Sequence, residues 1–410
     1  MNVKVDLSRL GIEEAKLASY QKKVDDAMDE LWSDKNPHTQ WVKLPMRINE
    51  EEIESMLTTA IAAQESCGLF VVIGNGGSYL GIKAAIEAIG EHAATAPEIE
   101  FIGEDICGSE FSKIMERMRH YEVNVCVISK SGETPETIVV YQVIKEYMFK
   151  RYGNEVAPKR IMVMTGKGDS TLRKLANKDG CGIFDISTDY SGNYGILSPA
   201  SLFPMAVAGI EIDRLLSGAE VMATDAAWDI NAGYYGVARK ILNESGKVAE
   251  IFQYSQPNLE SFAMWVSHLF MESDSKNGEG IYTTTMNLSR DFKAKGEFMR
   301  GDTPAFFQTE LVIDEVQDDI LLPKDIIDKT ESDTLGELNQ VIVDKMKEAM
   351  KTEDSDAIKI EIPKMDAFNL GQLIYFFLMS ASISAHMFGV DPFERKLIDV
   401  FKDKIKLFNK

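Results

Sequence analysis

The sequence predicts an α/β protein in which doubly wound, parallel sheets are covered by helices on both faces. Apolar runs of strand length alternate with helix-like segments from Leu69 onward, and this alternation is typical of parallel sheets. Glycine-rich or hydroxyl-rich turns follow two of these runs. Because 410 residues exceed one ordinary domain, we expect two domains of similar size.

Residues 1–55 are expected to form an N-terminal helical arm, because helical periodicity runs from Leu10 to Trp32. A first α/β domain is predicted over residues 56–212, where apolar runs lead into helices. Its predicted strands are Leu69–Ile73, Ile99–Gly103, Val123–Ile128 and Arg160–Thr165, and its predicted helices include Glu136–Lys150 and Thr171–Lys178.

A second α/β domain is predicted over residues 213–365, and a C-terminal helical segment over 366–410. The predicted strands here are Lys247–Gln253, Gly280–Thr285 and Phe306–Ile313. The predicted helices are Thr334–Lys351, Leu370–Phe388 and a basic-ended amphipathic helix at Asp391–Lys410.

The composition limits the classes of function. With 44 Lys and Arg against 65 Asp and Glu, the net charge is −21, which disfavours binding to nucleic acid or to an anionic membrane surface. The four cysteines form no CxxC pair and have no histidines at zinc spacing, so neither a disulfide framework nor a metal site is expected.

The N-terminus has no secretory apolar region, and no apolar run approaches the roughly 20 residues of a membrane span. We therefore expect a soluble, cytoplasmic protein.

A first loop that can carry chemistry is Gly74–Ser78, which follows one predicted strand and precedes a helix. Glycines here let an anionic ligand approach backbone N–H groups at a helix N-terminus. A dinucleotide loop is an alternative, because Glu104 and Asp105 follow the next predicted strand and could hold a ribose. A plain tight turn is the third interpretation.

A second loop, Ser129–Thr137, is more specific. Ser129, Ser131 and Thr134 offer three hydroxyls beside the first amides of a helix, and this combination suits a phosphate monoester. The alternative is that Thr134 only caps the helix, with Pro135 at its first position. A dinucleotide enzyme does not need this second loop, so the pair of loops favours a sugar phosphate.

These residues are similar to those of a known family. Val71–Leu80 (VVIGNGGSYL), followed by Ile128–Thr137 (ISKSGETPET), resembles the phosphoglucose isomerase family. Further matches are Gly195–Gly209, Trp265–Gly280 (WVSHLFMESDSKNGEG, beside the family's W…LF.ES.GK.G.G) and Phe368–Lys402. The match runs from about Leu69 to Lys410, and it implies two sugar-isomerase-type (SIS) domains with N- and C-terminal helical arms.

The resemblance implies interconversion of glucose 6-phosphate and fructose 6-phosphate, by ring opening and proton transfer between C2 and C1 through a cis-enediol. It implies no metal or organic cofactor. By the same resemblance, Gly77 and Ser78 face the substrate, and Lys402 takes the place of a lysine near the ring oxygen. The residues that would hold the phosphate are Ser129, Lys130, Ser131 and Thr134.

Several positions depart from the family pattern. Gly301 stands where we align the family's glutamate base, Asn193 stands where an arginine is usual, and Glu133 replaces a Ser or Thr of the phosphate loop. The family also uses a histidine for ring opening, yet no histidine lies between His268 and His386.

Other residues could take over these roles. Glu297 and Asp302 are the candidate catalytic carboxylates, since proton transfer needs a carboxylate within hydrogen-bond reach of C1 and C2. Arg300 or Arg395 could supply the positive charge that is missing at Asn193. For each carboxylate the alternative is a solvated surface charge.

Two functions follow. The first is a hexose 6-phosphate isomerase that works as a homodimer, because family members build each active site near a subunit interface. The second is a sugar-phosphate-binding protein of the same fold with weak or no isomerase activity.

Overall fold

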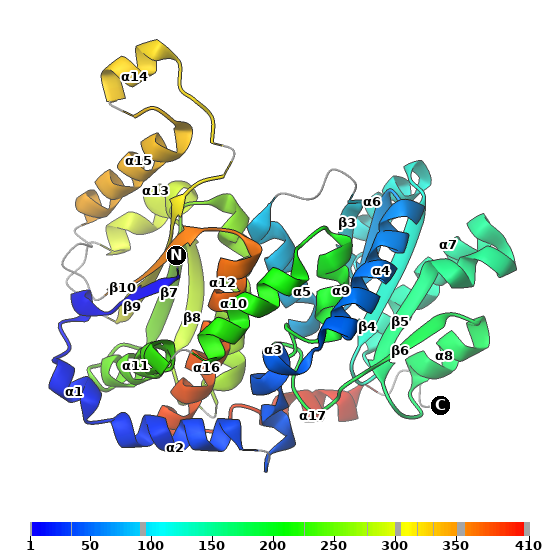
Figure 1. Cartoon of the computed structure of the whole chain (residues 1–410), viewed down its shortest axis with the longest axis horizontal. Coiled ribbons are helices and arrows are strands. Elements are labelled where there is room, and N and C mark those ends of the chain that lie inside the picture. Colours follow the sequence, from blue (N-terminus) through cyan, green and yellow to red (C-terminus); the bar gives the residue numbers. More distant parts are fainter. Residues whose placement is uncertain are drawn as a thin grey trace. The chain divides into compact units, whose positions relative to one another are not determined.

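The computed structural model describes residues 2–33, 35–90, 96–224, 226–276, 278–299, 305–317, 319–330, 332–350 and 357–405. Helices and strands alternate through most of the chain (Figure 1). The chain forms two compact units: one comprises residues 31–86, 90–216 and 393–410, and the other comprises 1–30, 87–89 and 217–392. We call them the 31–216 unit and the 217–392 unit.

The 31–216 unit contains a sheet of five parallel strands in the order β3-β2-β4-β5-β6. The strands are β2 (Leu69–Ile73), β3 (Glu98–Ile102), β4 (Val123–Ser129), β5 (Ile161–Gly166) and β6 (Gly182–Ile186). The first four lie within one residue of the predicted strands. The sequence did not indicate β6, because it is an edge strand whose residues are exposed or only partly buried and because it lacks a continuous apolar run.

Five α-helices of the described residues are given with their bounds in the paragraphs that follow. The other α-helices of the described residues are α1 (Glu14–Ala18), α2 (Gln21–Trp32), α3 (Leu44–Arg47), α5 (Gly77–Ile89), α6 (Gly108–His120), α7 (Pro135–Val156), α8 (Thr171–Asp179), α10 (Ile212–Thr224), α13 (Leu288–Met299), α14 (Lys324–Thr330), α15 (Leu335–Met350) and α17 (Lys396–Lys404).

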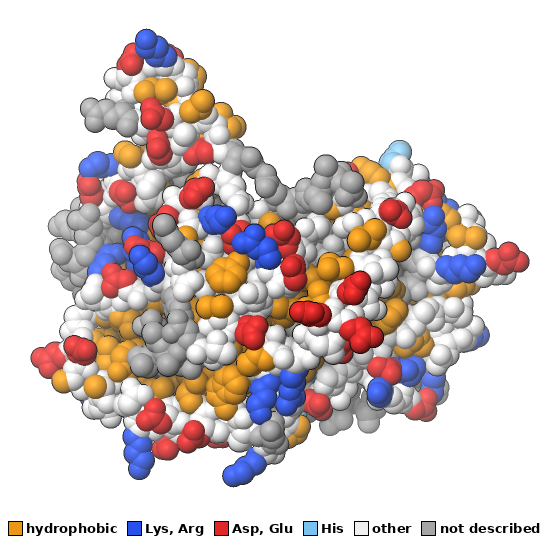
Figure 2. Space-filling view, viewed as in Figure 1, with side chains coloured by type: hydrophobic (Ala, Val, Ile, Leu, Met, Phe, Trp, Pro, Cys, Tyr) orange, Lys and Arg blue, Asp and Glu red, His pale blue; other side chains and the backbone are white. Residues whose placement is uncertain are grey.

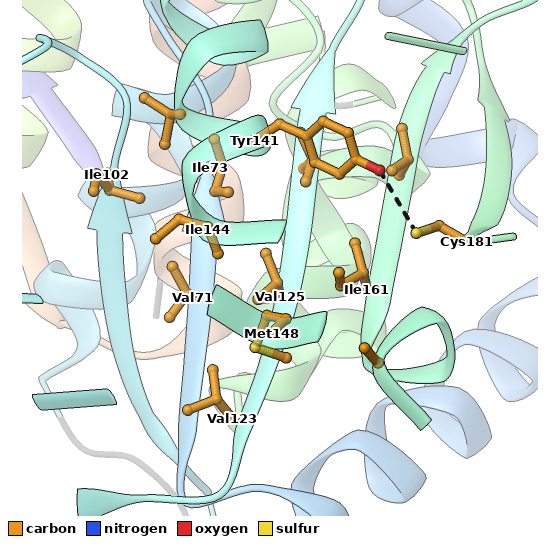
Figure 3. Close-up of a cluster of buried hydrophobic side chains, with 14 of the residues drawn as sticks. Val71, Ile73, Ile102, Val123, Val125, Tyr141, Ile144, Met148, Ile161 and Cys181 are labelled. Atoms are coloured by element: carbon orange, nitrogen blue, oxygen red, sulfur yellow. Dashed lines mark hydrogen bonds between the residues drawn. The ribbon is translucent and has the colours of Figure 1, made fainter. Parts of the chain in front are cut away.

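Alternate residues of the first sheet face opposite layers. Val71 of β2 and Val125 of β4 point into a cluster with Ile144 and Met148 of α7 (Figure 3). Side chains of α6 and α8 complete this cluster. Tyr141 closes one end of it, with its hydroxyl 3.6 Å from the sulfur of Cys181. The apolar runs of the sequence are therefore strands that are covered on both faces.

The opposite face of this sheet carries α4 (Glu50–Ser66) and α9 (Pro199–Val207). The ring of Phe70 in β2 meets that of Phe203 in α9 edge-on, with centroids 6.2 Å apart. Helix α4 begins at a capping box, in which Asn49 and Glu52 each bond the other's backbone N–H. This cap fixes where the helix starts.

The 217–392 unit contains a second five-stranded sheet, in the order β1-β10-β9-β7-β8. The strands are β1 (Lys4–Asp6), β7 (Ala249–Tyr254), β8 (Tyr282–Asn287), β9 (Phe306–Glu315) and β10 (Ala357–Lys364). All neighbours pair in parallel except β1, which is antiparallel to β10. The sequence did not indicate β1 or β10. Strand β1 has only three residues and gains its partner from the far end of the chain.

The terminal segments differ from the arms that the sequence suggested. Residues 1–30 belong to the 217–392 unit, because β1 joins its sheet, and the rest of the expected arm belongs to the other unit. The expected C-terminal segment is also divided: residues up to 392 lie in one unit and α17 lies in the other.

Helix α16 (Ala367–Phe388) is the core helix of its unit. It packs on α11 (Ala226–Glu244) and α12 (Glu260–Ser273). Its length and apolar composition would also suit a membrane span, yet 94% of its most apolar window is buried inside the fold. Burial of this kind is typical of a core helix.

Charged side chains of both signs are scattered over the face in view (Figure 2). A few charges are instead fully buried. Arg239 of α11 forms ion pairs with Glu250 of β7 and with Asp274, which follows α12. The Nη2 to Oδ2 distance in the Asp274 pair is 2.9 Å, and all three side chains have no exposed surface.

Hydroxyl groups satisfy further positions of this buried ion cluster. Ser384 of α16 donates to Asp274 at 2.6 Å and accepts from Arg239 Nε at 3.1 Å, while Thr309 of β9 donates to Glu250 at 2.6 Å. The guanidinium also lies 4.0 Å from the centroid of the Phe270 ring. The cluster thus joins two strands to three helices.

Replacing Arg239 with Met is expected to destabilise the protein by about 3 to 5 kcal/mol, because two buried carboxylates lose their counter-charge. Urea unfolding measures the change. Arg214→Met is the matched control, since Arg214 is half exposed and its pair with Glu211 spans 3.7 Å; that variant should lose less than about 1 kcal/mol. Equal losses in the two variants would contradict the assigned role of the cluster.

Candidate functional site

The two loops singled out by sequence lie at one edge of the first sheet. Strands β2 and β4 are parallel neighbours with Ile73 opposite Val127, so Gly74–Ser78 and Ser129–Thr134 both leave from their carboxyl ends. From β2 the chain goes to β3 on one side and then crosses to β4 on the other. Ligands of doubly wound sheets bind at such a switch point.

Gly77, at the start of α5, touches the loop that contains Asn193. A Cβ built on Gly77 would lie 2.4 Å from Asn193 Oδ1 and 2.5 Å from its backbone N. Asn193 is itself only 2% exposed. Only glycine permits this close approach. Two of the predicted substrate-binding residues, Gly77 and Asn193, are therefore in contact. Ser78 lies in the first turn of α5, and its side chain is outside the described part of the chain.

The Ser129–Thr134 loop is ordered by its own hydroxyls. Ser129 Oγ accepts from the Gly132 N–H at 3.2 Å and donates to Thr134 Oγ1 at 3.3 Å. Ser131 Oγ accepts from the Glu133 N–H at 3.2 Å. Thr134 occupies the N-cap of α7 without a capping bond from its side chain, which leaves the first-turn amides to other acceptors.

Lys130 connects this loop to the third one. Its ammonium donates to the backbone carbonyl of Tyr190 at 2.6 Å, three residues before Asn193. The three loops at the carboxyl edge of this sheet are therefore linked by two direct contacts, one between Gly77 and Asn193 and one between Lys130 and Tyr190.

The C-terminal segment reaches the same loop. Phe393 packs edge-on against Tyr194, with ring centroids 5.2 Å apart, and lies 5.9 Å from the ring of His38. Arg395 follows two residues later and is half-buried, at the start of α17. Lys402 lies on α17, and its side chain is outside the described residues. Tertiary packing thus places the start of α17 beside the Asn193 loop.

The carboxylates proposed for catalysis lie in the 217–392 unit. Glu297 is on an exposed face of α13, whose opposite face buries Gly296 and Met299. Outside the described residues lie Arg300, the aligned Gly301 and Asp302. Their positions stay predictions.

Sequence reasoning passed over one carboxylate in a matched motif. Glu272 lies near the end of α12 in the segment that resembles W…LF.ES, and it is half-buried. The segment after it is held by Asp274, through the buried ion cluster, and by Ser275, whose hydroxyl donates to the Ile281 carbonyl at 3.0 Å. Gly280 turns with φ +93° against Asp274. The motif itself contained the signal for Glu272.

The dinucleotide alternative depended on Glu104 and Asp105. The Asp105 carboxylate accepts from the Cys107 N–H at 2.9 Å and so shapes the turn before α6. Within the described residues, no group of three or more His, Cys, Asp or Glu side chains is placed to hold a metal ion. A hollow of about 400 Å³ between α4, β6 and α9 is lined by none of the predicted site residues.

Known proteins are similar to this chain in sequence. The family described as "Phosphoglucose isomerase" matches residues 31–350. A glucose-6-phosphate isomerase of Caldanaerobacter subterraneus subsp. tengcongensis is 33% identical over 383 residues, covering 88% of this chain and 84% of that protein. One of Listeria monocytogenes serotype 4b is 31% identical over 379 residues, with the same coverages of 88% and 84%.

Solved structures share the fold. A hypothetical protein from Thermus thermophilus has a TM-score of 0.85 at 20% identity, covering 98% of this chain and 99% of that chain. A glucose-6-phosphate isomerase from Chlamydia trachomatis has a TM-score of 0.80 at 14% identity, covering 98% and 87%. The predicted fold class, with two doubly wound SIS-type domains, is confirmed.

The double variant Ser131→Ala, Thr134→Ala is expected to weaken binding of inorganic phosphate by about 1 kcal/mol or more for each lost bond to the anion. Titration calorimetry measures the affinity. Ser112→Ala is the control, because that hydroxyl donates to the Gly108 carbonyl within α6. An unchanged affinity in the double variant would remove the anion site from this loop.

Proposed function

The chain belongs to the phosphoglucose isomerase family, and from this premise we propose that it interconverts glucose 6-phosphate and fructose 6-phosphate as an aldose–ketose isomerase. The observation that carries the proposal is the contact of three loops at the switch point of the first sheet. One of these loops offers the hydroxyls and the uncapped helix N-terminus that a phosphate monoester needs.

The phosphate is held by the Ser129–Thr134 loop. Ser129, Ser131 and Thr134 supply hydroxyl donors, and Lys130 supplies positive charge from a position fixed by its bond to Tyr190. A clamp of this kind binds the 6-phosphate and leaves the other end of the sugar free to react. Gly77 and Ser78 lie on the neighbouring loop and contact the sugar, whereas Asn193, predicted to do so as well, is buried against Gly77.

The chemistry is a proton transfer between two carbons. A carboxylate removes the proton from C2 of the open-chain aldose while O1 gains a proton, which gives the cis-enediol. The carboxylate then returns its proton to C1 while the C2 hydroxyl loses its proton and becomes a carbonyl, so that the net result also moves one proton from O2 to O1. Such a group works best when its surroundings limit access of water. Glu272 is half-buried on a segment held by buried bonds, whereas Glu297 is exposed. We therefore place Glu272 first as the base, and Glu297 and Asp302 stay alternatives.

Positive charge for the enediolate comes from the C-terminal segment. The family's arginine is replaced by Asn193, and Arg395 lies in the segment that packs on Tyr194 next to it. A guanidinium stabilises a developing oxyanion well. Lys402 assists ring opening from α17.

A binding protein without turnover is the alternative function, since the same phosphate clamp would serve it. No observation on the described residues favours it over the isomerase. The described thiols Cys67, Cys107, Cys126 and Cys181 are all free, in keeping with a reducing, cytoplasmic location.

The active form is a homodimer joined through α17. Helix α16 is apolar but is buried within its own unit. Helix α17 instead carries Leu397, Val400 and Phe401, which are 81%, 51% and 45% exposed. Their spacing of three and four residues puts them on one face, as an interface stripe requires.

The base is identified by comparing Glu272→Gln with Glu297→Gln. We expect Glu272→Gln to lower turnover by about two to four orders of magnitude and to abolish deuterium exchange from solvent into C2 of glucose 6-phosphate. Glu297→Gln should keep most of both. Exchange lost only in Glu297→Gln would transfer the role. A wild type that binds the sugar phosphate but shows neither deuterium exchange nor turnover would refute the proposed isomerase function.

The dimer is tested by light scattering at micromolar concentration, where the wild type should have twice the mass of one chain. Phe401→Glu should shift it to the monomer, because a charge would enter the apolar stripe. Lys396→Glu is the control, since Lys396 pairs with Glu394 at the start of the helix. A wild type that is monomeric would contradict the proposed dimer. A Phe401→Glu variant that is still dimeric would contradict the proposal that α17 forms the interface.

A further inference from the structure

Glu133 is the residue of the phosphate loop that departs most from the family pattern. Its carboxylate is turned toward α8 and accepts two bonds from Thr171: one from the backbone N–H at 2.6 Å and one from the hydroxyl at 2.7 Å. Thr171 is the first residue of α8. The extra negative charge thus lies at a helix N-terminus, where backbone amides and the helix dipole favour it.

The same loop meets α8 at further points. The Gly132 carbonyl accepts from the Leu172 N–H at 3.0 Å. Gly132 has φ +65°, and a Cβ on it would lie 2.2 Å from Ser170 Oγ. These contacts fix the backbone of Gly132 and Glu133 on α8, and the Glu133 side chain adds two bonds to the first residue of that helix.

The two neighbouring helix N-termini therefore treat anions differently. The N-terminus of α8 is occupied by the chain's own carboxylate, whereas Thr134 leaves the first turn of α7 without a side-chain cap. A free carboxylate beside the α7 turn would repel a bound phosphate. Holding Glu133 on Thr171 removes that repulsion and stiffens the loop at once.

We propose that Glu133 is a positioning residue for phosphate capture, which locks the Ser129–Thr134 loop onto α8 and keeps its own charge away from the ligand. This inference rests on the proposed function, because it assigns the loop to the 6-phosphate. Glu133 itself does not touch the substrate.

The test compares Glu133→Gln and Thr171→Val with the wild type. A glutamine keeps the shape but accepts with one oxygen only, and a valine removes the hydroxyl donor while keeping the N–H. In each variant the KM for glucose 6-phosphate and the calorimetric Kd of inorganic phosphate should rise by about tenfold, since bonds to a charged group are lost. The kcat should stay nearly constant, because the reacting carbons are at the other end of the sugar.

The matched control is Asp169→Asn, which removes a negative charge beside the same helix. Asp169 pairs with Lys174 at 3.0 Å and both groups are largely exposed, so its KM and Kd should be those of the wild type. The combined variant Glu133→Gln, Thr171→Val should bind phosphate no more weakly than the weaker single variant, because both changes break one contact.

Three outcomes would overturn the proposal. A lower KM or Kd in Glu133→Gln would show that the carboxylate faces and repels the phosphate. A lower melting temperature with unchanged KM and Kd would make Glu133 a helix cap only. Additive losses of phosphate affinity in the combined variant would show that Glu133 and Thr171 act independently. If the wild type has no turnover, the proposed function fails, while the phosphate affinities still decide the role of Glu133.

Discussion

The parallel pairing of β2 with β4 is the constraint on which the candidate site depends. Because Ile73 lies opposite Val127, the two loops that follow these strands must emerge at one edge, although they are far apart in the sequence. The strand-to-helix geometry then points the N-termini of α5 and α7 toward that edge. Replacing side chains in the loops can change what is bound there, whereas the place of binding is set by the sheet.

The 217–392 unit differs from the first unit, because charged side chains are buried at its centre. Arg239, Glu250 and Asp274 are all fully buried, so each must be matched by an ion partner or a hydroxyl. The cluster ties the segment after Glu272 to α11 and β7. If Glu272 is the base, as we propose, this anchor would hold its segment in place and give the buried ion cluster a use beyond stability.

In the 31–216 unit, two positions carry a charge that differs from the family pattern, and contacts with other elements compensate for each. Glu133 adds a negative charge to the loop that we propose to bind phosphate, yet its carboxylate is bonded to Thr171 in the first turn of α8. Asn193 lacks the positive charge expected of its position, yet Phe393 packs on the adjacent Tyr194 and brings the Arg395 segment close. Departures from the family pattern are thus matched by contacts from other elements, which a comparison of motifs alone does not reveal.

The sequence by itself determined the fold class, most strands and the position of the two loops that we propose to bind the substrate. Buried parallel strands such as β2 and β4 are continuous apolar runs, and glycines or hydroxyls after them mark turns of special geometry. Tertiary structure decided what depends on distant partners. The strand β1 exists only because β10 offers it an edge, and Gly77 meets Asn193 only after both loops are placed. Local sequence patterns predict which segments are buried and where turns occur. Pairing between segments that are remote in sequence depends on the packing of the whole chain.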